Sequence, residues 1–384
     1  MGGQKAKGVD PGGAYFWPGV AGFSAACWRF EFSPSAYCIV IRRWILGVIM
    51  SNEKFSEKMG DAMLDPRHNR IWKGILWLLG LLLLVDVLLS WYWSQEPDLR
   101  ELPSRENAVA GETIARELIF VSDTLLSKPG GYLSNDILPH RLWMDNMPAW
   151  EYGVLVQVRD FTRVLRRDMS RSQSQSQEDR DLAIAEPQFN FDAQSWAMPA
   201  TESEYRRGIK ALQSYLDRLT DANEGDGKFY ARADNLNYWL NEVQSRLGSL
   251  SLKLSQSVGR SELNMDVGSA ESVAKPGNEE DFVKTPWLKI DDAFYEARGA
   301  TWALTQLMRA AEVDFAEVLR KKNATVSFRQ MVRELEATQE TLWSPLILNG
   351  DGFGMLANHS LVMANYVSRA NAALVDLRKL LQEG

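Results

Sequence analysis

The apolar stretch between Ile71 and Trp93 constrains this chain more than any other feature of its sequence. From Ile75 onward it consists almost entirely of Leu, Ile, Val, Gly and Trp. At 1.5 Å of rise per residue, about 20 apolar residues match a hydrocarbon core of about 30 Å. The stretch ends in interface-type aromatic residues, and no small-residue cleavage site follows. We therefore predict one uncleaved transmembrane helix over residues 71–93.

Charged residues on the two sides of this stretch predict its orientation. Arg67, Arg70 and Lys73 lie close before the apolar core, whereas the next basic residues, Arg100 and Arg105, follow among several acids. Positive charge is retained on the cytoplasmic side of a membrane helix. The sequence thus predicts a short cytoplasmic segment over residues 50–70 and a large domain over residues 94–384 on the far side, which is the periplasm if the membrane is a bacterial inner membrane.

Residues 1–49 differ from the rest, since they are rich in Gly and aromatic residues and have no helical or strand period. We interpret them as a non-native or disordered N-terminal extension, with Met50 as the native start. A targeting signal around Arg42-Arg43-Trp44 is the alternative. Both cysteines, Cys27 and Cys38, lie in this segment. The predicted domain therefore has no disulfide and no thiolate metal site.

Beyond the apolar stretch the hydrophobic period is helical nearly everywhere. Apolar residues recur at spacings of three and four, which places each set on one stripe of a helix. The sets are Ile114, Leu118, Val121 and Leu125; Val154, Val158, Phe161 and Leu165; Ile209, Leu212, Leu216 and Leu219; Leu236, Leu240, Val243, Leu247, Leu250 and Leu254; Phe294, Ala297, Thr301, Leu304, Met308, Ala311 and Phe315; Met363, Val367, Ala370, Leu374, Leu377 and Leu381. The predicted fold is all-α: a single N-terminal transmembrane helix followed by an elongated antiparallel helical bundle of six or seven long helices.

Local signals predict where some helices start and where loops lie. Thr201 with Glu204 fits a capping box, and Pro148 fits the first turn of a helix. Residues 186–199 contain Pro, Asn and aromatic residues and predict an irregular loop packed on the bundle. Residues 261–284 mix Gly, Ser, Glu and Pro with few apolar residues and predict a flexible loop.

From Met50 onward the chain resembles a family of bacterial inner-membrane proteins known only as a domain of unknown function. The resemblance rests on residues 130–136 (GGYLSND), 142–151 (LWMDNMPAWE) and 186–192 (EPQFNFD). It implies one anchor and a helical domain, and it implies no activity.

No motif for catalysis, cofactors or metals stands out in the chain. The three histidines, His68, His140 and His359, have no metal-ligand spacing. The glycines from Gly350 to Gly354 fit a turn better than a phosphate loop, and Asp291-Asp292 fits a helix start. A net charge of -7 argues against non-specific binding to nucleic acid.

Asp86 is the least expected residue of the predicted membrane helix. A carboxylate near the bilayer centre costs about 2.5 to 3.5 kcal/mol on insertion scales. One interpretation is a contact with another membrane helix, which Ser90, one turn further on, would share. The other is that the apolar surroundings tolerate a protonated Asp.

The segment from Leu142 to Trp150 places Trp143, Met144, Met147 and Trp150 beside polar residues. Aromatic and Met side chains of this kind suit a partner-binding surface. They suit a buried segment between helices equally well.

These features predict a membrane-anchored periplasmic helical protein that acts as a non-enzymatic scaffold or partner-binding module. Its expected partners are the lipid bilayer and a protein, or a second copy through the anchor or bundle, with no cofactor and no nucleic acid. The alternative is a sensor of small molecules or envelope stress. A sensor would need a separate cytoplasmic partner, because residues 50–70 are too short for an output domain.

Overall fold

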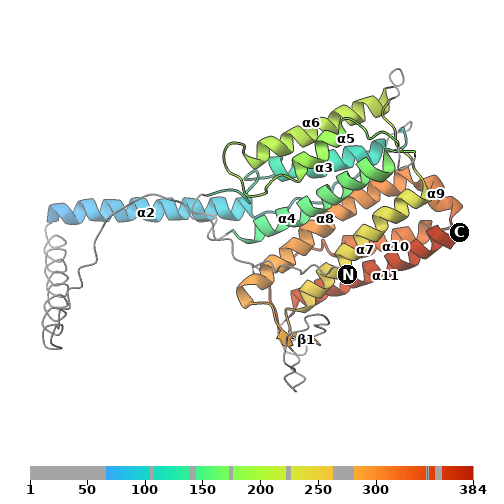
Figure 1. Cartoon of the computed structure of the whole chain (residues 1–384). Helices are drawn as coiled ribbons and strands as arrows, with labels where there is room; N and C mark the ends of the chain where they lie inside the picture. Colours follow the sequence, from blue (N-terminus) through green and yellow to red (C-terminus); the bar gives the residue numbers. More distant parts are fainter. Residues whose placement is uncertain are drawn as a thin grey trace, which may run out of the picture. The chain divides into compact units, whose positions relative to one another are not determined.

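The computed structural model describes residues 66–103, 108–137, 144–172, 176–221, 226–262, 281–342, 344, 346–350 and 357–383. The chain divides into two compact units, Met1–Gly80 and Leu81–Gly384. The boundary falls inside helix α2 (Pro66–Trp93). The second unit contains the remaining helices and is called the helical unit below (Figure 1).

Helix α2 has the length and composition of a membrane span. Its segment Trp72–Trp93 is 22 residues long with a mean hydropathy of 2.2, and almost none of it is buried. At 1.5 Å per residue this segment is about 33 Å long. The predicted apolar helix is therefore present, and leucines such as Leu76 and Leu83 expose more than half of their surface.

The helical unit confirms the predicted all-α bundle. Its helices are α3 (Glu112–Ser127), α4 (Asn146–Val164), α5 (Leu182–Phe189), α6 (Thr201–Thr220), α7 (Ala233–Ser255), α8 (Ile290–Asp314), α9 (Ala316–Lys321), α10 (Thr325–Ala337) and α11 (His359–Glu383). A π-helical turn, Leu165–Met169, extends α4, and a 3-10 turn, Trp287–Lys289, precedes α8. Two three-residue strands, β1 (Arg260–Glu262) and β2 (Asp281–Val283), pair antiparallel with Ser261 opposite Phe282. They border the segment that was predicted as a flexible loop, of which residues 263–280 lie outside the described residues.

The heptad stripes form the core. Every residue of the six predicted stripes is buried. Long helices pack side by side, and α7 and α11 run antiparallel, as the pairs Ser251–Ser368 and Gln244–Arg378 show. The periodicity therefore predicted the buried face of each of these helices.

Helix α8 occupies the centre of the helical unit, where it contacts α3, α4, α7, α10 and α11 (Figure 1). Its close approach to α4 depends on two glycines. A Cβ at Gly153 would lie 2.1 Å from the carbonyl oxygen of Glu296, and one at Gly299 would lie 2.0 Å from that of Trp150. Both distances are shorter than any van der Waals contact, so the two backbones touch only because neither position has a side chain.

Two local predictions are wrong. Helix α6 is preceded by Ala200, so Thr201 lies inside the helix, and its hydroxyl donates to the carbonyls of Asp192 and Ser195 and caps no amide. Helix α5 continues to Phe189 with Pro187 inside it, so the irregular segment starts at Asn190 and not at Glu186. Pro148 lies in the first turn of α4, as predicted.

Candidate functional site

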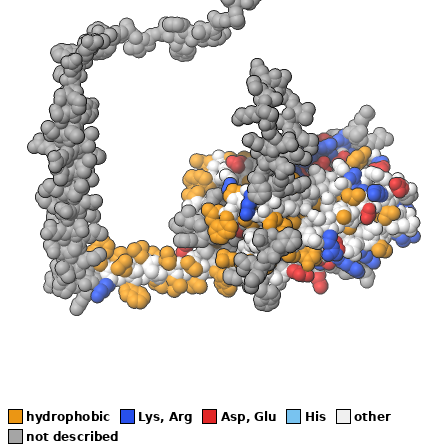
Figure 2. All heavy atoms as spheres, turned by 90° about the horizontal axis from the view of Figure 1, so that it is seen from below, with side chains coloured by type: hydrophobic (Ala, Val, Ile, Leu, Met, Phe, Trp, Pro, Cys, Tyr) orange, Lys and Arg blue, Asp and Glu red, His pale blue; other side chains and the backbone are white. Residues whose placement is uncertain are grey.

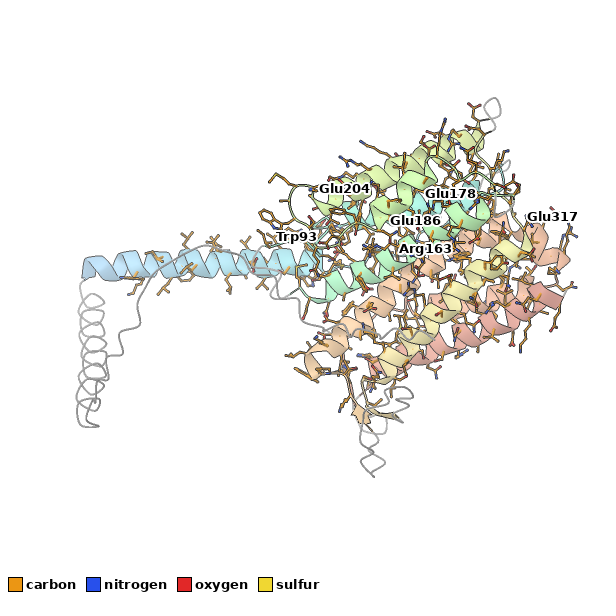
Figure 3. All side chains as sticks on the ribbon, in the orientation of Figure 1. Trp93, Arg163, Glu178, Glu186, Glu204 and Glu317 are labelled. Carbon is orange, nitrogen blue, oxygen red and sulfur yellow. The ribbon has the colours of Figure 1, made fainter. Side chains whose placement is uncertain are left out.

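The end of α2 is packed against the helical unit through a glycine. Gly130, with φ of 83°, lies beside the indole of Trp93, and a Cβ there would be 2.8 Å from Trp93 Cγ. Both the backbone conformation and the space therefore require glycine. Figure 3 labels Trp93 where α2 ends. The contact places the loop after α3 next to the last residue of the apolar helix, and we call this end of the helical unit the anchored end.

The segment from Glu96 to Leu102 is bound along the helical unit. Arg298 of α8, which is 8% exposed, donates from Nε to both carboxylate oxygens of Glu96 at 2.8 and 3.1 Å. Arg298 Nη1 also donates to the carbonyl oxygens of Thr338 and Glu340. Further on, Arg100 donates to Glu117 at 2.5 Å and covers the ring of Phe120 at 3.6 Å. The connection between α2 and the bundle is thus fixed by side chains of α3 and α8.

Asp86 and Ser90 lie one turn apart on α2. Ser90 is 7% exposed, and its backbone carbonyl accepts a hydrogen bond from the Ser94 hydroxyl at 2.7 Å. Asp86 is half-buried. Their contact with another membrane helix stays a prediction.

The predicted aromatic segment is part of the core. Met144, Met147 and Trp150 are 3% exposed or less, and the Trp150 ring packs on Trp302 of α8 with ring centroids 5.2 Å apart. Trp143 lies outside the described residues. Buried side chains cannot form an exposed partner surface, so these three fit the alternative interpretation, a buried segment that joins α4 to α8.

A buried ion pair holds the loop after α3 against α4. Lys128 and Glu151 are both fully buried, with Nζ 2.7 Å from Oε1. The carboxylate of Glu151 also accepts the backbone amides of Leu133 and Ser134, each at 2.8 Å, and the Ser134 hydroxyl at 2.5 Å. Every oxygen of this buried carboxylate therefore has a partner, as a buried charge requires.

A cleft of about 640 Å³ opens at the anchored end. Its walls come from the loop after α3, the first turns of α4 and α8, the segment after α5 and the end of α7. Its charged lining residues are Asp145, Lys253, Lys284, Lys289, Asp292 and Glu296. Lys253 Nζ contacts the carboxylate of Glu296. Acidic and basic side chains thus line the same cleft.

Two neighbouring carboxylates of this end hold their protons more tightly than usual. Partial burial, together with the charges of Asp145 and Asp291, raises the pKa of Asp292 to about 6. Burial and Asp145 also raise the pKa of Asp291. The pair lies in the first turn of α8, as predicted. Near neutral pH the cleft can bind or release a proton at Asp292.

The opposite end of the helical unit, which we call the far end, is held by ion pairs. Arg218 Nη2 lies 2.8 Å from Asp179 and 2.6 Å from Asp181, and its Nη1 lies 3.1 Å from Asp226. Arg163 lies 3.7 Å from Glu186 between α4 and α5, and Figure 3 shows these two side chains together with Glu178 close by. A second hollow of about 430 Å³ lies beside the π-helical turn, and its lining includes four arginines and three acids. Their opposite charges nearly balance.

Among the described residues, no group of three or more His, Cys, Asp or Glu side chains is placed to hold a metal ion. His359 accepts a hydrogen bond at Nδ1 from the amide of Leu348. It therefore ties the start of α11 to the preceding segment. His68 lies near the start of α2, and His140 lies outside the described residues.

No pattern in the sequence indicates the residues that organise the anchored end. Lys128 and Glu151 are 23 positions apart, and Arg298 is 202 positions from Glu96. Polar residues that pair over such long separations do not recur at a helical spacing, so their pairing cannot be recognised in the sequence. Only the glycines after Lys128 marked a loop with a special backbone.

Comparison with known proteins identifies the family of this chain. Neither the curated proteins nor the solved structures gave a match. A family model described as "Uncharacterized protein conserved in bacteria" matches residues 67–384, from the start of α2 to the end of the chain. The chain therefore belongs to the bacterial family DUF2333.

Proposed function

We propose that this protein spans the bacterial inner membrane once and holds its helical unit on the periplasmic side, where it acts as a non-enzymatic scaffold or partner-binding module. One observation carries the membrane part. The segment Trp72–Trp93 combines a mean hydropathy of 2.2 with an apolar surface of which only 6% is buried among the described residues. An uncovered apolar surface of this size is stable in a bilayer and not in water.

The fixed connection supports a scaffold. Glu96 is held by Arg298, and the backbone carbonyl of Asp98 accepts a hydrogen bond from the Trp302 indole at 3.4 Å. Side chains from the centre of the bundle thus bind the first residues after α2. A partner bound to the helical unit would be held close to the membrane, which a flexible linker would not achieve.

A sensor is the second candidate, and the cleft at the anchored end favours it. Helix α8 lines that cleft with Asp292 and Glu296, and two residues later it holds Glu96 through Arg298. A ligand or proton in the cleft therefore acts on the same helix that binds the connection to α2. Signalling across the membrane would need a cytoplasmic partner.

Topology is tested by cysteine labelling in a Cys27→Ser, Cys38→Ser background. Val326→Cys, 80% exposed at the far end, is expected to react with an impermeant maleimide in spheroplasts. Ser51→Cys is expected to react only after lysis. The reverse pattern would place the helical unit in the cytoplasm and overturn the proposal.

Crosslinking in native membranes separates the two candidates. A scaffold is expected to yield a reproducible partner that Asp292→Asn with Glu296→Gln leaves bound. A sensor is expected to change its crosslinks with an added ligand or with pH, and these two substitutions are expected to abolish the change. Recovery of the protein alone under all conditions would count against both candidates.

A further inference from the structure

Two short segments carry the most exposed aromatic side chains of the described residues beyond α2. They hold Trp196 (65%) with Met198 (97%) before α6, and Trp287 (79%) with Leu288 (75%) before α8. The other described tryptophans beyond α2, at 150, 239 and 302, are almost fully buried. Exposed tryptophans with apolar neighbours on both segments suggest a surface that is covered in the cell.

Both segments lie at the anchored end. The Tyr132 hydroxyl donates to the carbonyl of Ala193, and Asn135 donates to that of Ser195, which ties the first segment to the loop that Trp93 contacts. Pro286 and Lys289, which flank the second segment, line the same cleft as Tyr132 and Ala193. Figure 1 shows the starts of α6 and α8 at one end of the helical unit, and Figure 2 shows hydrophobic side chains gathered there.

Internal hydrogen bonds hold these segments in shape. The Ser195 hydroxyl donates to the carbonyl of Pro199 at 2.8 Å, and the Thr201 hydroxyl donates to that of Ser195 at 2.9 Å. In the second segment, the amide of Lys289 donates to the carbonyl of Pro286 at 2.8 Å, and that of Thr285 to Gln256 at 3.0 Å. Thus the apolar side chains are presented outward by ordered turns.

We propose that the anchored end docks on the lipid surface of the membrane that α2 spans, through Trp196, Met198, Trp287 and Leu288, which we call the docking face. This inference rests on the proposed membrane anchor. Trp91 and Tyr92, exposed at the end of α2, are the aromatic residues expected at the bilayer interface, and the adjacent Trp93 contacts the anchored end. Through the contact of Trp93, the docking face is therefore connected to the point at which α2 is proposed to leave the bilayer.

The chemistry of the docking face fits a lipid interface. Indole rings place their apolar body and polar N–H at the headgroup level. Lys284 and Lys289, both exposed, flank Trp287 and Leu288 on either side. Ammonium groups beside interfacial apolar residues attract anionic headgroups. Trp, Met and Leu with flanking Lys thus match the surface of the bilayer that α2 is proposed to span.

The depth of the docking face can be measured on the full chain in vesicles of phosphatidylethanolamine and phosphatidylglycerol. In the Cys27→Ser, Cys38→Ser background, nitroxide labels are attached at Met198→Cys and, separately, at Trp287→Cys. Collisions with oxygen, which is enriched in lipid, are compared with collisions with a water-soluble nickel complex. Val326→Cys is the matched control, because Val326 is as exposed as Trp287 (80% and 79%) and lies at the far end.

We expect the oxygen-to-nickel collision ratio at positions 198 and 287 to exceed that at position 326 several-fold. Ratios equal to that at 326 would mean that the face is in water. Protection from both reagents would mean a protein partner or a second copy. Either result would overturn the docking proposal.

A label at Leu83→Cys separates this inference from the proposed function. If it reports lipid while positions 198 and 287 report water, α2 spans the membrane and only the docking is wrong. If it reports water, the membrane anchor itself is wrong. As a second test, Trp287→Ser with Leu288→Ser is expected to lower the ratio at position 198 several-fold, whereas Val326→Ser leaves it unchanged. An unchanged ratio with the double substitution would contradict a shared docking face.

Discussion

The two ends of the helical unit differ in where they place charged and apolar side chains. At the anchored end, charge is buried and apolar groups are exposed: Lys128 and Glu151 are sealed inside, while Trp287 faces outward. At the far end, ion pairs lie at or near the surface. Arg329 of α10 pairs with Glu312 of α8, and Lys321 pairs with Glu317 within α9. Water and salt screen the attraction within an exposed ion pair. A buried ion pair is stable only while each charged group keeps its partners. This difference agrees with the proposal that the docking face meets the membrane while the far end faces bulk water.

The largest effect is expected from Glu151→Leu. It leaves the Lys128 ammonium buried without its carboxylate and removes the acceptor of two backbone amides. We expect a loss of about 3 to 5 kcal/mol in the free energy of unfolding, measured by urea titration of the detergent-solubilised protein. The exposed far-end control Glu317→Leu is expected to show no measurable change. A loss below about 1 kcal/mol would show that the buried pair is not essential.

Arg218→Met tests the most buried network of the far end. Arg218 and Asp179 are each 7% exposed as side chains, but Asp226 is half exposed, so water can reach one side of the network. We expect a loss of about 2 to 3 kcal/mol, smaller than for Glu151→Leu. Adding Asp179→Asn to Arg218→Met is expected to recover part of it, since an uncompensated carboxylate is removed. A loss larger than that for Glu151→Leu would reverse the ranking of the two ends.

The cleft predicts a pH dependence at the anchored end. Because the pKa of Asp292 is raised from 3.8 to about 6, the folded state binds more protons than the unfolded state between these values. The free energy of unfolding therefore falls as pH rises through this window. Asp292→Asn removes this penalty and is expected to stabilise the protein above pH 6, by less than about 1 kcal/mol because solvent screens the site. The difference from the parent protein should vanish below pH 4, and a variant destabilised at pH 7 would contradict the assignment.

The smallest effect is expected from Arg329→Ala at the far end. Its side chain is 61% exposed, and its partner Glu312 is 26% exposed. A pair this open to water contributes little, so the expected loss is below about 0.5 kcal/mol and disappears at high salt. Thermal unfolding at low and high ionic strength measures it. A large loss that salt does not reduce would mean that the far end is as water-excluded as Glu151.

The stripes of the core could be predicted because burial repeats with the helix. Leu236 to Leu254 in α7 and Met363 to Leu381 in α11 are buried along their whole length, as their spacing indicates. Helix boundaries were less predictable. Pro187 disfavours a helix by propensity, yet the packing of Leu182, Ala185 and Phe189 keeps α5 helical through it.

The anchored end could be predicted only in part. The apolar helix and the glycines after Lys128 are visible in the sequence, but the pairing of Lys128 with Glu151 follows from how α3 and α4 pack. The exposure of Trp196 and Trp287 was equally hidden. Both lie in irregular segments, where no period separates an inward from an outward side chain.

The glycine contact between α4 and α8 also has a consequence for synthesis. Gly153 and Gly299 are 146 positions apart, yet each backbone fills the space left by the other. At about 5 to 20 residues per second, roughly 7 to 30 s pass between the synthesis of α4 and that of its partner. During that interval the face of α4 that packs on α8, including Trp150, has no native cover. The newly made chain must therefore avoid aggregation through this exposed apolar face until α8 has been synthesised.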